Sequence, residues 1–308
     1  MSVHTAYAFA RTFEYLGTAM LVGGLVFVAL LWPAGADARG ARRVLIGGWL
    51  VSTLATLAAL GLGASWASGG GIADALKRSV VEPALTSDFG RPWAVLVLLD
   101  ALMLVVLADL LRRGSTAARS LPWRVGALAV GAGILRVYGL TGHAKETAHP
   151  LVSQLADVAH LLAMAVWIGG LLMLLGGVLP RRRPDELGTV LPRYSVLALG
   201  SVCAAVASGT LLAWGLLNNI GDLVSTSYGH VLLLKLALLL VVLGAAFASK
   251  TWVEHRLDFV VLLRGEGSIT ASAPALVRPV VLSVAAETGL LALVLVVASF
   301  LVTADPGR

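Results

Sequence analysis

The sequence predicts an all-α fold, a polytopic membrane protein whose eight transmembrane helices form two parallel four-helix repeats. Three observations predict it. Hydrophobic residues make up 58% of the 308 residues and charged residues 13%, with a mean hydropathy of +0.89, whereas soluble domains carry about 25% charged residues. The apolar residues form long blocks, and a helix of about 20 residues spans the hydrocarbon core of a bilayer. Short motifs of the first half also recur in the second half.

Eight apolar blocks are long enough to cross a bilayer. They do not alternate between apolar and polar residues, which argues against a transmembrane β-barrel. Between the second and third blocks the chain is too polar to span, and we expect a helix lying on the membrane surface within residues 68–91. We place the spans near residues 10–32, 44–67, 92–111, 123–142, 157–179, 194–217, 230–249 and 279–302.

The orientation follows from the lysines and arginines, because short loops rich in these residues stay in the cytoplasm. One set of loops holds Arg39, Arg42, Arg43, Arg112, Arg113, Arg119, Arg124, Arg181, Arg182, Arg183, Arg193, Lys250, Arg256, Arg264 and Arg278. The other set holds Arg11, Lys77, Arg78, Arg91, Lys145 and Arg308. The first, larger set is therefore expected in the cytoplasm of a bacterial inner-membrane protein, with both termini outside.

An internal repeat divides the chain into a first unit, residues 1–150, and a second unit, residues 151–308. Three pairs of motifs recur in the same order with offsets of 146, 148 and 139 residues. They are Gly23-Gly24 with Gly169-Gly170, Trp66 with Trp214, and Phe89-Gly90-Arg91 with Tyr228-Gly229-His230. Because four helices return the chain to the same side, the two units are expected to be parallel and related by an axis along the membrane normal.

Several functions are excluded by composition. The net charge of +6 lies in short clusters between apolar blocks, which is typical of membrane topology, so no nucleic-acid partner is expected. Cys203 is the only cysteine, which excludes an intrachain disulfide, a CxxC zinc site and a CxxCH haem attachment. No nucleotide-binding GxxxxGK[ST] motif is present, so ATP is not expected to drive transport. We expect no catalytic residues.

Five of the six histidines are predicted at the outer face, which points to a metal-uptake site there. His143 and His149 belong to the loop before the fifth span, and His160 opens that span with Met164 at i+4 on the same helical face. An imidazole above a thioether suits Cu(I), although imidazole alone also suits zinc, iron or nickel. Glu14 occupies the place equivalent to His160 in the first unit. One alternative is that His160 is a half-buried histidine hydrogen-bonded to a neighbouring helix, with Met164 and Trp167 as ordinary packing. Another is that Glu14 pairs with Arg11 or Arg91 at the lipid headgroups.

Four ionisable residues fall within predicted spans, where charges are costly and often functional. Asp100 and Arg136 lie at matching depths in neighbouring spans, so we expect an ion pair that locks the two helices rather than a transport role. Lys235 is close enough to the outer end of its span to reach the surface. Glu287 is deeper and has no predicted partner, so it is expected to be protonated or to face a polar pathway.

From His160 onward the sequence resembles the CopD copper-resistance family. The resemblance is strong over residues 157–302 and weaker over residues 1–150, where Gly142-His143-Ala144 and Phe89-Gly90-Arg91 carry it. The motifs in the stronger region are His160 with Trp167-Ile168-Gly169-Gly170-Leu171, Pro192-Arg193-Tyr194-Ser195, Ala207-Ser208-Gly209 with Trp214, Thr226-Ser227-Tyr228-Gly229-His230, Leu233-Leu234-Lys235-Leu236, and Glu287. The resemblance implies an inner-membrane protein that moves copper from periplasm to cytoplasm, with a CopC-like periplasmic copper-binding protein as a possible partner.

The sequence therefore predicts a copper transport protein, with copper as the ion carried. Two alternatives stay open. A b-type haem electron-transfer protein needs paired intramembrane histidines, of which only His160 lies well inside a span. A non-catalytic membrane subunit that docks a periplasmic partner needs no metal at all.

Overall fold

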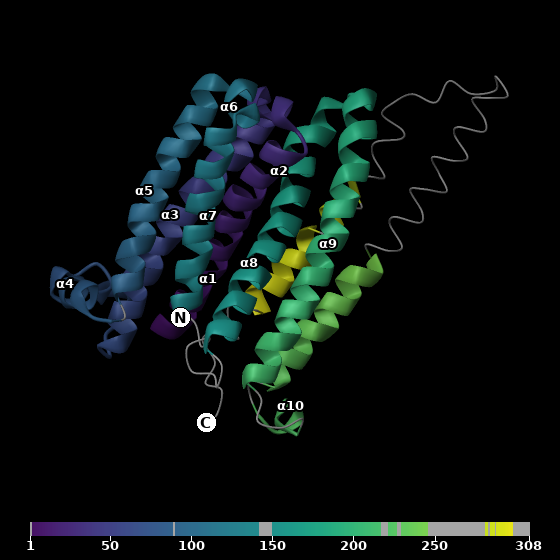
Figure 1. Cartoon of the computed structure of the whole chain (residues 1–308). Coiled ribbons are helices and arrows are strands. Elements are labelled where there is room, and N and C mark those ends of the chain that lie inside the picture. Colours follow the sequence, from purple (N-terminus) through teal and green to yellow (C-terminus); the bar gives the residue numbers. More distant parts are fainter. Residues whose placement is uncertain are drawn as a thin grey trace, which may run out of the picture.

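The computed structural model describes residues 2–88, 90–141, 150–216, 221–226, 229–245, 281–282, 284–286 and 288–297. Within these ranges every regular element is a helix, and the long helices run side by side as a bundle (Figure 1). Among the described residues, five helices are long and apolar enough to cross a membrane: Val3–Leu30, Arg39–Ala67, Gly90–Arg113, Leu151–Arg181 and Asp185–Gly215. The predicted all-α membrane class is confirmed, and the total of eight spans stays a prediction.

The described part of residues 1–150 has four long helical segments. The first is continuous through α1 (Val3–Thr18), the π-helix η1 (Ala19–Gly23) and α2 (Gly24–Leu30). The others are α3 (Arg39–Ala67), α5 (Gly90–Arg113) and α7 (Leu121–Thr141). Short elements join them: η2 (Pro33–Asp37), η3 (Ile72–Asp74), α4 (Arg78–Thr86) and α6 (Ser115–Arg119). Helix α4 falls in the segment predicted to lie on the membrane surface.

The second unit begins with α8 (Pro150–Met173), which continues through the π-helix η5 (Leu174–Val178) and η6 (Leu179–Arg181). Helix α9 (Pro184–Leu216) begins ten residues before the predicted span, and Pro192 lies inside it. The short α10 (Asp222–Ser225) follows. Shorter apolar helices cover Gly229–Ala245 and Val284–Val297, within the last two predicted spans.

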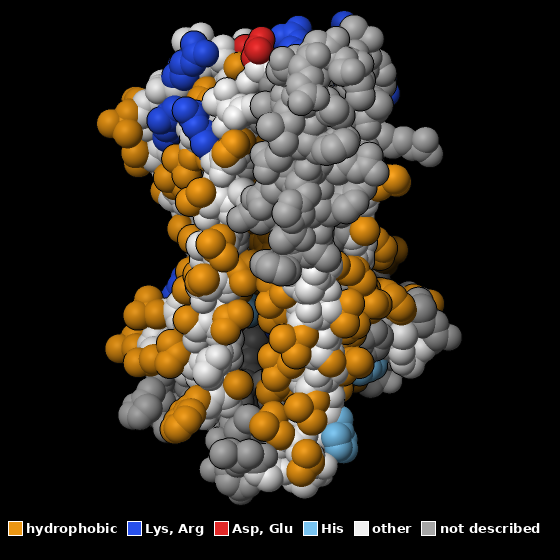
Figure 2. Space-filling view, turned by 90° about the vertical axis from the view of Figure 1, so that its right-hand side faces the viewer, with side chains coloured by type: hydrophobic (Ala, Val, Ile, Leu, Met, Phe, Trp, Pro, Cys, Tyr) orange, Lys and Arg blue, Asp and Glu red, His pale blue; other side chains and the backbone are white. Residues whose placement is uncertain are grey.

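The two ends of the bundle differ in the side chains that they carry. Lysines and arginines gather at the end near α6, and histidines appear at the other end (Figure 2). Arg39 opens α3, Arg112 and Arg113 close α5, and Arg181 closes η6. We call this the arginine-rich end. At the opposite end His4 lies near the start of α1, with its ring 4.9 Å from that of Trp66.

The first and fifth predicted spans cross at very close range. A Cβ added to Gly23 would lie 1.9 Å from the carbonyl oxygen of Ala165, and one added to Gly169 would lie 2.1 Å from that of Ala19. Only glycine at these two positions permits such an approach, which is typical of small-residue contacts between membrane helices. The contacts are reciprocal, because Ala165 and Gly169 follow Ala19 and Gly23 by the same 146 residues.

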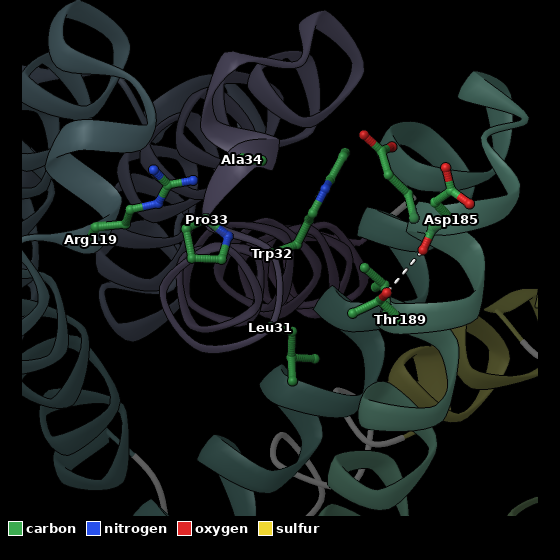
Figure 3. Close-up of a pocket in the computed structure, with 9 residues that line it drawn as sticks. Leu31, Trp32, Pro33, Ala34, Arg119, Asp185 and Thr189 are labelled. Atoms are coloured by element: carbon green, nitrogen blue, oxygen red, sulfur yellow. Dashed lines mark hydrogen bonds between the residues drawn. The ribbon is translucent and has the colours of Figure 1, made fainter.

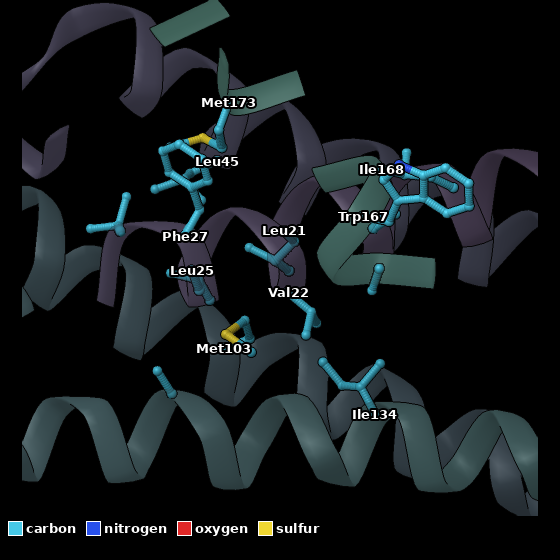
Figure 4. Close-up of a cluster of buried hydrophobic side chains, with 14 of the residues drawn as sticks. Leu21, Val22, Leu25, Phe27, Leu45, Met103, Ile134, Trp167, Ile168 and Met173 are labelled. Atoms are coloured by element: carbon cyan, nitrogen blue, oxygen red, sulfur yellow. The ribbon is translucent and has the colours of Figure 1, made fainter. Parts of the chain in front are cut away.

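Apolar side chains around this crossing form the main core, which joins the two units. It includes side chains from η1, α2, α3, α5, α7 and α8 (Figure 4). The labelled members are Leu21, Val22, Leu25, Phe27, Leu45, Met103, Ile134, Trp167, Ile168 and Met173. The core therefore fixes α1 against α8, and with them the polar residues that both helices carry.

Candidate functional site

The His160 side chain packs against α9. Its Nδ1 lies 2.9 Å from the carbonyl oxygen of Ala205 and 3.3 Å from the hydroxyl oxygen of Ser208. Gly209 leaves room for the ring, since a Cβ there would lie 3.3 Å from Cε1 of His160. The imidazole is half-buried. Its plane is therefore fixed by α9 rather than left to rotate in solvent.

The contact with Ala205 determines the tautomer of His160. A carbonyl oxygen can only accept a hydrogen bond, so Nδ1 carries the proton and donates it. The hydroxyl of Ser208 donates to the carbonyl of Ala204 at 2.6 Å, which leaves its lone pairs for the same Nδ1–H. The Nε2 lone pair is then available to accept a hydrogen bond or to bind a metal. Histidines that bind metals commonly hold their other ring nitrogen in this way.

Met164 and Asp157 flank His160 on α8. Met164, one turn further along, is partly buried and packs against the main core. Asp157 is half-buried, and its Oδ2 lies against Gly139 of α7, where a Cβ would come within 2.7 Å. Asp157 is close enough to Arg11, Lys235 and Arg136 for electrostatic interaction. We call Asp157, His160 and Lys235 the histidine cluster.

Lys235 approaches this cluster from the helix Gly229–Ala245. Its ammonium interacts electrostatically with both Asp157 and His160, although no ion pair within 4.0 Å joins Lys235 to either residue. Within the part of the chain that the structure describes, no group of three His, Cys, Asp or Glu side chains is placed to hold a metal ion. His143, His149 and Glu287 lie outside the described residues.

A second polar group lies on the other side of the α1–α8 crossing. Arg11 donates to Oε2 of Glu14 at 2.7 Å, and the hydroxyl of Thr56 donates to Oε1 at 3.1 Å. Glu14 and Arg11 are both fully buried, and Asp100 of α5 is 2% exposed. We call Arg11, Glu14, Thr56 and Asp100 the carboxylate cluster. Glu14 faces α3 and is buried inside the bundle rather than exposed at its end.

Arg11 was expected among the outer loop residues, but it is enclosed by aromatic rings. Its guanidinium carbon lies 4.8, 5.1 and 5.7 Å from the ring centres of Tyr15, Trp93 and Tyr138. It also donates to the Tyr15 hydroxyl at 2.6 Å. Cation–π contacts of this kind stabilise a desolvated arginine. The sequence signal that identifies this ion pair is the i,i+3 spacing of Arg11 and Glu14.

The predicted ion pair between Asp100 and Arg136 is wrong. Arg136 points to α8, where it donates to the side-chain oxygen of Gln154 at 2.6 Å. Asp100 faces Glu14 and Thr56 instead. Equal depth placed the two residues at the same level, but their side chains leave α5 and α7 in different directions.

A further cavity of 320 Å³ lies at the arginine-rich end, between the chain after α2 and the first turns of α9 (Figure 3). Trp32, Arg119 and Asp185 are among its lining residues. Arg181 lies over the Trp32 ring at 5.5 Å and pairs with Glu186 at 2.9 Å. The lining offers two carboxylates and one arginine rather than the sulfur and imidazole ligands that soft copper prefers.

Comparison with known proteins assigns both halves of the chain. Residues 1–151 match the family described as "Copper resistance protein D-like, N-terminal domain", and residues 188–301 match "Copper resistance protein D". The chain is 26% identical over 268 residues to "Copper transport protein CutJ" of Bacillus subtilis (strain 168), covering 84% of this chain and 49% of that relative. It thus spans about half the length of the curated relative. No solved structure matches.

These matches agree with the apolar helices of the structure, and the family and relative names point to a transport protein rather than an enzyme. The chain is a multi-pass membrane protein that belongs to the copper resistance protein D family.

Proposed function

We propose that the protein moves copper across the bacterial inner membrane, from the periplasm toward the cytoplasm, through a histidine site at its outer face. The arginine-rich end is the cytoplasmic end, because arginine-rich loops are retained there. The histidine cluster then lies toward the periplasm, and both termini are outside the cytoplasm. The family and the printed name of the relative support copper as the ion.

One observation carries the proposal: the Nδ1 of His160 donates to the carbonyl of Ala205 at 2.9 Å. In the neutral ring this bond fixes the proton on Nδ1, so the lone pair of Nε2 is the one that can bind copper. Met164, one helical turn further along, supplies the kind of sulfur that Cu(I) accepts. His143 and His149 would complete the ligand set from the loop before α8. Glu14 remains in the proposal only as a neighbouring charge, since its carboxylate is held by Arg11 and Thr56.

We further propose that the eight-helix bundle consists of two tandem four-helix units. The reciprocal contacts of Gly23 with Ala165 and of Gly169 with Ala19 support this arrangement. In an interface between two copies related by a twofold axis, residue i of one copy contacts residue j of the other, and residue j of the first contacts residue i of the second. Copper would pass between units whose polar groups flank this crossing. A CopC-like periplasmic protein is a fitting donor of the ion.

Copper accumulation in proteoliposomes tests the function. His160→Ala and His143→Ala are each expected to reduce uptake to the level of empty vesicles. His230→Ala is the matched control, because His230 is exposed, its Nε2 lies 2.9 Å from the carbonyl of Val224, and it does not belong to the proposed ligand set. Wild-type uptake by both His160→Ala and His143→Ala would reject the site.

Metal analysis after stringent washing separates transport from a purely docking role. Copper retained by the wild-type protein and lost from His160→Ala supports the site. If neither protein retains copper, the histidines serve another purpose.

A further inference from the structure

The carboxylate cluster carries more negative than positive charge. Arg11 supplies one positive charge, whereas Glu14 and Asp100 supply two carboxylates that are close enough to repel each other. All three side chains are buried, with Asp100 at 2% exposure. Asp100 lies ten residues after Gly90, the first residue of α5, which places it about 15 Å along the helix and near the centre of a bilayer. An uncompensated charge at this depth is strongly unfavourable.

Asp100 also lacks the hydrogen bonds that an ionised carboxylate requires. Neither of its carboxylate oxygens has a partner in the described residues. Thr56 lies nearby, but its one hydroxyl hydrogen is donated to Glu14. Trp49 of α3 donates to the backbone oxygen of Asp100 at 2.9 Å, not to its side chain. The Asp100 carboxylate is therefore buried without a neutralising charge of its own and without a hydrogen bond to either oxygen among the described residues.

The polar groups around Asp100 come from three helices. Helix α1 contributes Glu14 and Arg11, and α7 contributes the Tyr138 hydroxyl, which bonds to Thr18 at 2.8 Å. Helix α3 presents Thr56, which does not titrate. Arg136 of α7 is directed to Gln154. The one positive charge in the carboxylate cluster is that of Arg11, which is already paired with Glu14.

We propose that Asp100 holds an exchangeable proton, and that a cation bound at the histidine cluster displaces it. A proton removes the surplus charge and requires no extra space in a packed interior. Arg11 connects the two clusters, because it pairs with Glu14 and interacts electrostatically with Asp157. Positive charge arriving beside Asp157 weakens the electrostatic attraction between the Asp157 carboxylate and Arg11. This change favours ionisation of Asp100. Copper and proton binding then oppose each other, as linkage requires.

Infrared spectroscopy of the copper-free protein tests the resting state without requiring transport. The wild-type protein is expected to show the carbonyl band of a buried protonated carboxylic acid at neutral pH. Asp100→Asn should lose this band, and Asp100→Glu should restore it at a shifted frequency. Asp109→Asn is the matched control on the same helix, since Asp109 is a surface acid paired with Arg113. Absence of the band in wild type, or its persistence in Asp100→Asn, overturns the proposal.

Proton release on adding Cu(I), followed with a pH indicator beside a copper-binding assay, tests the displacement. This step rests on the proposed copper function, so binding and release are measured on the same sample. Wild type should release about one proton per copper bound, and Asp100→Asn should bind copper but release none. Release that persists in Asp100→Asn and disappears in Lys235→Met assigns the proton to Lys235 and rejects the inference. Failure of wild type to bind copper rejects the proposed function and leaves the infrared result as the test of Asp100.

Discussion

Replacement of Arg11 by methionine is expected to lower the free energy of unfolding by about 3–5 kcal/mol, which is typical when one partner of a buried ion pair is removed. The 2.7 Å contact with Glu14 is fully buried on both sides. Arg11→Met leaves that carboxylate unpaired beside Asp100, and it also removes the cation–π contacts with three aromatic rings. Both losses act in the same direction.

Glu14→Gln is expected to cost less, about 1–3 kcal/mol, the range for a buried hydrogen-bonded group left partly unsatisfied. Asp100 can then ionise and supply the negative charge that Arg11 has lost. The double variant Arg11→Met/Glu14→Gln should be more stable than Arg11→Met alone. The difference, read from a double-mutant cycle, measures the coupling of the pair.

The assay is reversible unfolding in mixed detergent micelles, followed by helical circular dichroism. Arg78→Met is the matched control. Arg78 and Glu82 are also 2.7 Å apart, but they are 88% and 63% exposed, so solvent screening limits the expected change to under about 1 kcal/mol. Equal effects of Arg11→Met and Arg78→Met, or strict additivity in the cycle, would refute the argument from burial.

Two glycines provide the remaining predictions. Gly169→Leu should separate α1 from α8 and lower the thermal unfolding temperature by several degrees, because even a Cβ would lie 2.1 Å from a backbone oxygen. Gly126→Leu is the control: a side chain there meets open space, so the unfolding temperature should stay unchanged. Gly209→Val should displace the His160 ring and weaken copper binding at least tenfold, whereas Gly200→Val, in open space on the same helix, should not. Equal copper affinity of the two α9 variants would contradict the role assigned to His160.

The membrane class and the family could be predicted from the sequence, because both depend on the pattern of residues along the chain. Long apolar blocks can only be buried in lipid or in a large core, and the ordered motifs from His160 to Lys235 identify the family. Five predicted spans have helices of sufficient length and apolarity. The sequence predicts the start of the first span near residue 10, whereas the helix begins at Val3, because polar residues of its first turns are accommodated against neighbouring helices.

Side-chain direction was the part that the sequence left undetermined. Depth along a helix can be counted from residue numbers, so Asp100 and Arg136 were placed at one level. The direction in which each points depends on how α5 and α7 are rotated, and this packing turns Arg136 toward Gln154. Arg11 was misplaced for a related reason. A basic residue near a helix end is usually solvated, and only the surrounding rings of Tyr15, Trp93 and Tyr138 make its burial favourable.

The 146-residue offset that aligns the two crossing glycines also places Arg11 opposite Asp157. If an ancestral single unit formed a homodimer about this axis, identical residues at this position would face each other with like charge. The present pair, Arg11 and Asp157, has opposite charges and attracts. This contact therefore favours the pairing of two different halves over the pairing of two identical ones. Such divergence makes each half the specific partner of the other. In the proposed two-unit arrangement, two copies of the first half would bring two arginines together, so each half would depend on the other for this contact.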